Sequence, residues 1–240
     1  IYLPPTYYFD TDKKYPVLYF HDGNNIFDKA TSFLGTEWNV DEVAEKLINE
    51  SKIKDVIIVG IYNTSDRIDE YTFEYDKRRK GGGKGEQYLN FIVQTLKPFV
   101  DKEYRTLTDR YNTGIIGSSL GGLISLFAGI KYSYYFYYIG AVSPALWWND
   151  LGVIKVFEEL KEIPDIKVWL DMGTKEGTKD GVLKEFTDCI LHVRQLENIL
   201  LQKGFIINKN LKYLEIEDAV HNEISWSNRI DKILLYFLSK

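Results

Sequence analysis

The sequence predicts an α/β fold in which a mostly parallel central sheet carries helices on both faces. Apolar runs of strand length alternate with longer amphipathic stretches along the 240 residues, and this alternation is typical of parallel sheets with helical crossovers. Several runs are continuously apolar, as expected of strands that are buried on both faces. No internal repeat or Pro/Ser-rich linker interrupts the pattern, so we expect one domain over residues 1–240.

The elements of the first half can be followed in chain order. Residues 1–5 have the pattern of the end of a strand whose beginning would lie upstream. An apolar strand is predicted at 17–20, a helix with acidic residues in its first turn at 40–48, and the clearest buried strand at 56–61. A polar loop follows, and then a helix at 88–100 that contains Pro98 near its end.

The second half continues the alternation of strands and helices and contains a glycine-rich turn. A short buried strand at 115–116 leads through a glycine-rich turn into a helix of small residues at 120–130. The remaining strands are predicted at 138–142, 166–170 and 211–216, and the remaining helices at 153–160, about 182–202 and 224–238. In such sheets the chemistry lies at the carboxyl ends of the strands.

Composition and charge exclude several classes of function. The net charge of −5 disfavours nucleic acid and anionic membranes as partners, and no apolar run approaches the length of a membrane span. The single cysteine, Cys189, excludes an internal disulfide framework. With three histidines and no cluster at metal-ligand spacing, we expect no metal and no cofactor.

A serine lies at the strongest motif of the chain. Residues 117–121 match G-x-S-x-G with Ser119 at the centre, between a buried strand and a helix. This spacing suits a nucleophile on a strained turn, because side chains two residues before and after the serine would collide. The following helix N-terminus directs backbone N–H groups at a developing oxyanion. A tight structural turn is the simpler alternative, and Ser118 is in the wrong register for the nucleophile.

A nucleophilic serine needs a base, and the histidines are few. His221 follows the last predicted strand, where hydrolases of this topology carry their base. His192 lies on a long helix and is expected to be a surface or packing residue, whereas His21 at a strand end suits a structural or pocket-lining role.

The third group should be a carboxylate after the strand at 166–170, giving the chain order serine, acid, histidine. Glu176 is preferred because an acid three residues beyond Gly173 can fold back over the sheet edge. Asp171 is the alternative acid, although it would also suit capping of the loop backbone, and Asp180 is a weaker third candidate.

Five stretches of the sequence resemble the "putative esterase" branch of the α/β-hydrolases, which includes enterochelin, feruloyl and acetylxylan esterases, S-formylglutathione hydrolases and mycolyltransferases. They are GSSLGG at 117–122, SPALWW at 143–148, HDGNNIFD at 21–28, LDMGTKEG at 170–177, and HNE at 221–223 followed by Trp226. The resemblance implies an α/β-hydrolase fold with Ser119 as nucleophile and His221 as base, and it favours Glu176 as the acid. It also implies an oxyanion hole made by the N–H of Leu120 and that of Gly23 or Asn24.

The expected activity is that of a serine carboxylesterase with an acyl-enzyme intermediate, acting on a small-molecule or carbohydrate-linked ester. An acyltransferase that uses the same intermediate and a non-catalytic binding protein on the same fold are the alternatives. Which ester is used, the oligomeric state and the location stay open, with the cytoplasm slightly favoured over secretion.

Aromatic residues near the predicted active edge are candidates for a substrate pocket. Trp147 and Trp148 would wall an acyl or sugar site or belong to the core, and Tyr62 and Arg67 lie with Asn63, Glu70 and Tyr71 in the loop after the strand at 56–61. The glycine-rich segment 80–85 does not fit a phosphate-binding loop, because no strand precedes it and Gly85 follows its lysine. A mobile lid or solvated loop is expected there.

Overall fold

The computed structural model describes residues 1–162, 164–177 and 189–240. Its main sheet has six strands in the order β2-β1-β5-β6-β7-β8, and every neighbouring pair is parallel. The strands are β1 (Val17–Phe20), β2 (Ile57–Gly60), β5 (Thr113–Ser118), β6 (Tyr138–Val142), β7 (Lys167–Gly173) and β8 (Leu211–Ile216). The predicted parallel sheet is confirmed, and its register places Ser118, Val142 and Asp171 side by side at the carboxyl edge.

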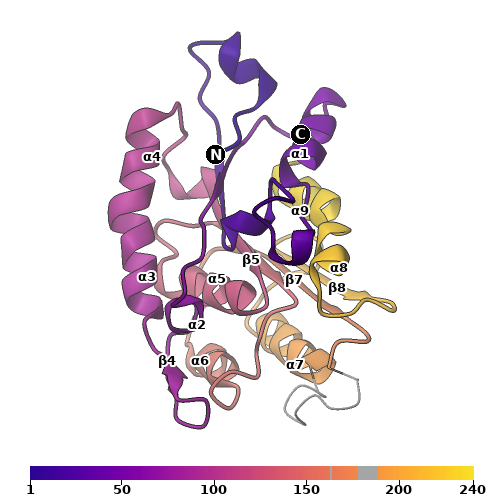
Figure 1. The fold of residues 1–240 in the computed structure, drawn as a ribbon. Coiled ribbons are helices and arrows are strands. Elements are labelled where there is room, and N and C mark those ends of the chain that lie inside the picture. Colours follow the sequence, from indigo (N-terminus) through magenta and orange to yellow (C-terminus); the bar gives the residue numbers. More distant parts are fainter. Residues whose placement is uncertain (163, 178–188) are drawn as a thin grey trace.

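Helices cover both faces of this sheet (Figure 1). One face carries α1 (Val40–Asn49), α8 (Glu223–Ser227) and α9 (Ile230–Leu238), and the other carries α3 (Gly85–Phe91), α4 (Lys97–Glu103), α5 (Leu120–Lys131), α6 (Gly152–Glu159) and α7 (Cys189–Gln202). Side chains alternate along the strands between two hydrophobic cores. In β1, for example, Tyr19 packs with the second set of helices and Leu18 with the first.

Helix α5 is the most deeply placed helix of the fold. Every residue from Leu120 to Ile130 is buried, because the helix packs on β5 and β6 and is covered by its neighbours. Its small residues allow this close approach. An alanine in place of Gly129 would bring its Cβ within 3.0 Å of Ile139 on β6.

Two predicted helices differ in the structure. The helix expected at 88–100 begins earlier and has three parts, α3, a π-helical turn η4 (Ile92–Leu96) and α4. Pro98 lies in the first turn of α4 and has no N–H to donate, which is a local reason for the irregular turn before it. The helix expected at 224–238 is divided into α8 and α9 at Arg229, whose side chain turns into the interior.

The helix expected at about 182–202 is described from Cys189 onward, and its first residues lie outside the described part of the chain. Short 3₁₀ helices complete the structure: η1 (Pro5–Tyr8), η2 (Gly23–Asn25), η3 (Phe33–Gly35) and η5 (Arg110–Asn112). The predicted strand end at 1–5 is reduced to an antiparallel bridge between Tyr2 and Ile58. No helix of the described residues is long and apolar enough to span a membrane.

The polar loop after β2 contains structure that the sequence pattern did not predict. It holds α2 (Arg67–Glu70) and a two-stranded antiparallel sheet of β3 (Tyr75–Asp76) and β4 (Gly81–Gly82). The expectation of a mobile or solvated loop at 80–85 is therefore wrong. The Gly82 N–H donates to Asp69 Oδ1 at 2.7 Å, and a Cβ on Gly82 would lie 2.8 Å from the Trp148 ring.

Candidate active site

Ser119 occupies the tight turn between β5 and α5. Its backbone has φ 56° and ψ −119°, a left-handed conformation that costs energy in a non-glycine residue. The two flanking glycines make the turn possible, because a Cβ on Gly117 would lie 2.7 Å from the Gly121 backbone, and one on Gly121 would lie 3.2 Å from His21. The strained turn projects Ser119 from the carboxyl edge of the sheet, where it is half-buried.

Ser119, His221 and Glu176 form a continuous hydrogen-bonded chain. Ser119 Oγ lies 3.0 Å from His221 Nε2, and His221 Nδ1 lies 2.7 Å from Glu176 Oε2. An ionised carboxylate can only accept, so Nδ1 carries the imidazole proton and donates it to Glu176. Nε2 is then free to accept the proton of the serine hydroxyl. His221 comes from the loop between β8 and α8, and Glu176 from the segment after β7.

Glu176 is held as an anion although it is 3% exposed. Burial acts to raise its pKa, but hydrogen bonds from His221, the Ser143 hydroxyl and the Gly173 N–H, with the charge of His221, outweigh burial and lower the pKa. A buried carboxylate of this kind stabilises the imidazolium that forms when His221 accepts a proton. The side chain is fixed on both of its oxygens.

The alternative acid Asp171 has its contacts elsewhere than at His221. Asp171 lies inside β7 rather than in the loop after it, and its carboxylate contacts Arg229, Trp169 and the Ser143 N–H. Burial raises the pKa of Asp171, and the charge of Arg229 and the hydrogen bonds oppose that rise. Asp180 lies outside the described residues.

Backbone N–H groups near Ser119 distinguish the two candidates for the second oxyanion donor. The Gly23 N–H donates to the Ile61 carbonyl at 2.7 Å, so it is already committed. The N–H groups of Leu120 and Asn24 have no acceptor among the residues that the structure describes. Of the pair left open by the sequence, Asn24 is therefore the one that can donate to a bound oxyanion.

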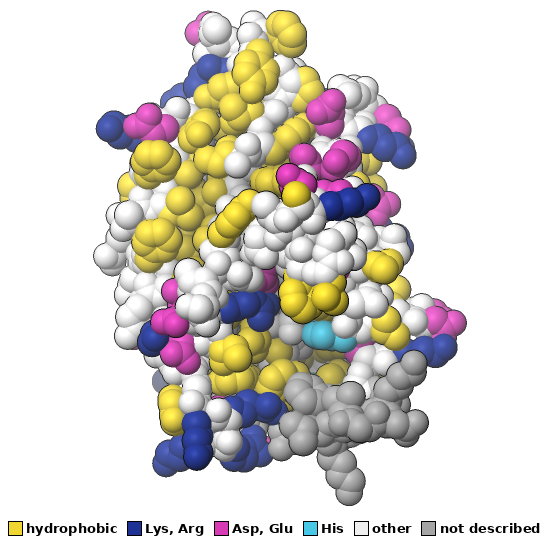
Figure 2. Space-filling view, viewed as in Figure 1, with side chains coloured by type: hydrophobic (Ala, Val, Ile, Leu, Met, Phe, Trp, Pro, Cys, Tyr) yellow, Lys and Arg dark blue, Asp and Glu magenta, His cyan; other side chains and the backbone are white. Residues whose placement is uncertain are grey.

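A cavity of about 420 Å³ opens beside Ser119. Most of its lining residues have polar side chains, and they come from the segments after β1 and β2, from the end of β5 and from α8: Asp22, Asn24, Asn25, Thr31, Phe33, Asn63, Arg67, Ser118, Ser119, Glu223 and Trp226. Figure 2 shows a histidine side chain at the edge of a hollow on this face, with basic and hydrophobic side chains around it. Arg67, predicted as a pocket residue, is among the lining residues.

The other predicted pocket residues do not line this cavity. Trp148 is buried in the core, where its indole N–H donates to the Glu74 carbonyl. Trp147 packs against the same core, with the Arg79 guanidinium 4.4 Å from its ring centre. Tyr62 is largely exposed beside the cavity residue Asn63.

Several site residues were not recognised from the sequence. The sequence assigns Trp226 no role beyond its place in the resemblance to the esterase family. In the structure its ring lies edge-on to His221 at 4.8 Å and also lines the cavity. Phe33 is placed by its N–H donating to Asn25 Oδ1, and no local pattern marks it. Arg229 has no local signal either, because it lies among polar residues that include Asn228, Asp231 and Lys232.

The remaining histidines and the cysteine lie apart from this chain of contacts. His21 is completely buried, with Nδ1 2.8 Å from the Tyr88 hydroxyl. Burial lowers the pKa of His21 to about 3, the Asp22 charge opposing this and Arg67 adding to it, so the ring is neutral at physiological pH. His192 is half-buried on α7, and Cys189 is buried at the start of the same helix. Among the described residues no group of His, Cys, Asp and Glu could hold a metal ion.

The parallel sheet, the strained serine turn after its central strand and the histidine after its last strand define a hydrolase of the α/β class. Residues 1–237 match the family described as "Putative esterase", and the chain belongs to this family. Bacillus subtilis YbbA is 28% identical over 227 residues, 92% of the chain and 84% of that protein.

Two further relatives carry information on fold and activity. The ferri-bacillibactin esterase BesA of Bacillus subtilis is 27% identical over 157 residues, 59% of the chain and 51% of that protein. The crystal structure of the BES protein from Bacillus cereus superposes with a TM-score of 0.71 at 22% identity and covers 93% of the chain and 83% of that protein. The family and these relatives support an α/β-hydrolase that acts on esters.

Proposed function

We propose that the protein is a serine carboxylesterase in which Ser119, His221 and Glu176 act as the catalytic triad. The observation that carries this proposal is the unbroken chain of contacts, 3.0 Å from Ser119 to His221 and 2.7 Å from His221 to Glu176. These residues come from three separate loops at one edge of the sheet. Such an arrangement is what nucleophilic catalysis by serine requires.

In the proposed first half-reaction, Ser119 Oγ attacks the ester carbonyl carbon while His221 Nε2 accepts the hydroxyl proton. The N–H groups of Leu120 and Asn24 donate to the oxyanion of the tetrahedral intermediate. The imidazolium then gives its proton to the departing alkoxide, which leaves as an alcohol. Water repeats the sequence on the acyl-enzyme and releases the carboxylic acid.

The cavity beside Ser119 supports a small, partly polar ester group as substrate. Amide groups of Asn24, Asn25 and Asn63 and the ring of Phe33 lie in its wall, so hydrogen bonding and aromatic contact are both available to a bound group. The name of BesA assigns a siderophore ester to that relative. For this chain, siderophore, feruloyl, acetyl and thioester substrates are all within the proposal.

A Ser119→Ala variant tests the mechanism. Without the nucleophile, turnover of p-nitrophenyl acetate should fall about 10⁴- to 10⁶-fold, and a fluorophosphonate should no longer label the protein. Ser118→Ala is the matched control, because it removes the neighbouring hydroxyl and should keep the label on Ser119. Retained turnover in a correctly folded Ser119→Ala variant would overturn the proposal. Products formed with an added alcohol would separate acyl transfer from hydrolysis.

A further inference from the structure

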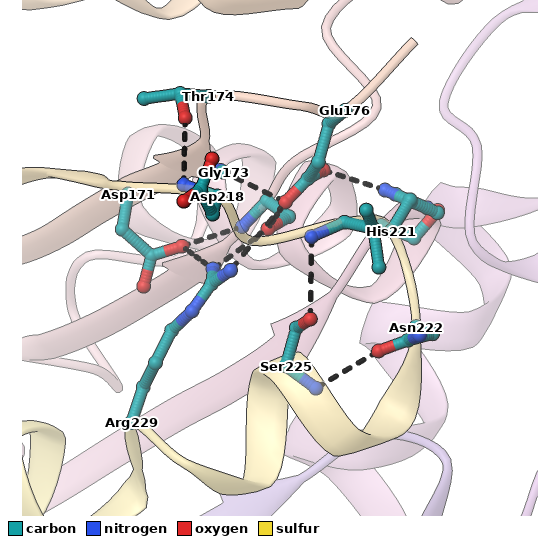
Figure 3. A network of polar contacts seen from close by, with 12 residues as sticks. Asp171, Gly173, Thr174, Glu176, Asp218, His221, Asn222, Ser225 and Arg229 are labelled. Carbon is teal, nitrogen blue, oxygen red and sulfur yellow. Dashed lines mark hydrogen bonds and ion pairs between the residues drawn. The ribbon is translucent and has the colours of Figure 1, made fainter. Parts of the chain in front are cut away.

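A second carboxylate and an arginine lie next to Glu176, on the side of Oε1 (Figure 3). Asp171 is 0% exposed, Arg229 1% and Glu176 3%. Neither Asp171 nor Arg229 lines the cavity beside Ser119. Asp171 and Arg229 are therefore buried together with Glu176, on the side away from His221. Neither of these two residues has a direct part in the proposed mechanism.

The charges of this buried cluster balance only when His221 is protonated. Asp171 and Glu176 contribute two negative charges and Arg229 one positive charge, so one negative charge is left to face a neutral imidazole. The nearest pair toward the surface, Lys175 with Asp218 at 2.7 Å, adds no net charge. The unbalanced negative charge lies beside the ring on which an imidazolium forms during acylation and deacylation.

Arg229 is matched mainly by Asp171 and only weakly by Glu176. Its Nη1 lies 2.5 Å from Asp171 Oδ1, whereas its Nη2 lies 3.5 Å from Glu176 Oε1. The other Asp171 oxygen accepts the Trp169 indole N–H at 2.6 Å. Because both oxygens accept from groups that can only donate, the contacts favour the ionised form of Asp171.

Ser143 connects the two carboxylates. Its N–H donates to Asp171 Oδ1 at 3.0 Å, and its Oγ accepts from Arg229 Nη1 at 2.8 Å. The single hydroxyl proton is then donated to Glu176 Oε1 at 2.6 Å. With the Gly173 N–H also on Oε1 at 2.9 Å, this oxygen is occupied and Oε2 is left for His221.

We infer that Asp171 is a positioning residue for the ester-cleaving reaction, acting through Arg229 on Glu176 and His221. The inference rests on the proposed triad. If Asp171 lost its charge, the buried guanidinium would have Glu176 as its nearest carboxylate and would offset the charge that stabilises the imidazolium. Binding of the substrate would change little, since neither residue lines the cavity.

The charge-removing variant Asp171→Asn and the double variant Asp171→Asn/Arg229→Gln test this inference. In the single variant, kcat should fall about 10- to 100-fold, and the acid limb of the pH profile of kcat/KM should shift by about 1 unit to lower pH. A shift of 1 unit corresponds to about 1.4 kcal/mol of interaction between the Asp171 charge and the imidazolium. The double variant restores the net charge of the cluster, so the acid limb should return and most of kcat should recover.

The outcomes separate an electrostatic role from a purely structural one. Glu217→Gln is the matched control, because it removes an exposed carboxylate from the same region without breaking the Lys175–Asp218 pair and should leave the profile unchanged. A double variant as inactive as the single one, or an acid limb that does not move in Asp171→Asn, would overturn the inference. If Asp171→Asn does not fold, recovery of activity in the double variant still supports the inference, and loss of activity in the double variant still contradicts it. Labelling of Ser119 by fluorophosphonate in the wild-type protein shows separately whether the triad proposal holds.

Discussion

Two arginine–aspartate pairs lie on either side of β5, one at the end of β1 and one at the end of β7. Arg67 holds Asp22 through two hydrogen bonds of 2.6 and 2.8 Å and lies in the wall of the cavity, with 29% of its side chain exposed. Arg229 holds Asp171 in the interior, out of reach of the cavity.

The two pairs act on different properties of the site. Asp22 has φ 54° and directly precedes Gly23 and Asn24, and its backbone N–H donates to the Tyr71 hydroxyl oxygen at 2.9 Å. Its ion pair therefore fixes the course of the backbone that presents the Asn24 N–H. The Asp171–Arg229 pair instead borders Glu176, the carboxylate of the proposed triad, and in our proposal it sets the charge there. One pair provides geometry and the other provides electrostatics.

The largest loss of kcat is expected for Glu176→Gln, which changes the carboxylate next to the Asp171–Arg229 pair. An amide can donate to Nδ1 and so favour the tautomer of His221 that cannot accept the serine proton, and kcat should fall about 10³- to 10⁴-fold. KM for p-nitrophenyl acetate should change little. Glu217→Gln, which alters an exposed carboxylate just after β8, serves as the control. Loss of activity confined to KM would mean that Glu176 binds substrate rather than orienting the base.

A smaller effect is expected on the geometric side, from the double variant Asp22→Asn/Arg67→Gln. This change preserves the net charge but removes the bidentate clamp, so the Asn24 N–H should lose its alignment and kcat should fall about 10- to 100-fold. The acid limb of the pH profile should stay in place. Full activity in this double variant would show that the hydrogen bonds of the Asp22–Arg67 pair are not needed for catalysis. The proposed difference between the two pairs would then be wrong, because charge balance would be enough for both.

Replacement of His21 is expected to have the smallest effect on rate but a clear effect on the pH dependence of stability. Its pKa is lowered to about 3 by burial, from an ordinary value of 6.5, so the unfolded chain takes up a proton that the folded protein excludes. The stability that the neutral ring contributes is present above about pH 6.5 and is lost as the pH falls toward 3, by up to about 1.4 kcal/mol per pH unit.

Urea unfolding between pH 7 and 4 measures this slope, and His21→Asn should flatten it. An unchanged slope would show that other groups carry the acid sensitivity. His21 directly precedes Asp22. A slope that disappears in His21→Asn would therefore place the acid sensitivity of folding next to the Asp22–Arg67 pair.

Sequence patterns predicted the alternation of strands and helices because both periodicities are local. The strands at 17–20 and 211–216 have the predicted bounds. The serine turn was recognisable because a side chain at 117 would clash with the Gly121 backbone at 2.7 Å and one at 121 would crowd His21 at 3.2 Å. The break at Arg229 was not predictable, since helical spacing continues across it and only the buried carboxylates explain the turn.

The site was less accessible to sequence reasoning wherever it depends on long-range contacts. The sequence favours Glu176 and leaves Asp171 as the alternative acid, and the structure separates them because β7 extends through Asp171 to Gly173. The choice between Gly23 and Asn24 depends on the Ile61 carbonyl, which lies on a different strand end. Trp148 was expected either to wall a pocket or to belong to the core, and the structure places it in the core, close to Gly82.

The complete burial of residues 120–130 in α5 has a consequence for how this enzyme can diverge. A helix without an exposed face offers no position at which substitution is free, so the proposed nucleophile is anchored next to a segment that tolerates little change. The cavity, in contrast, is walled by the segments after β1 and β2 and by α8. New substrate preferences should therefore be acquired in those segments, while the serine turn is inherited unchanged.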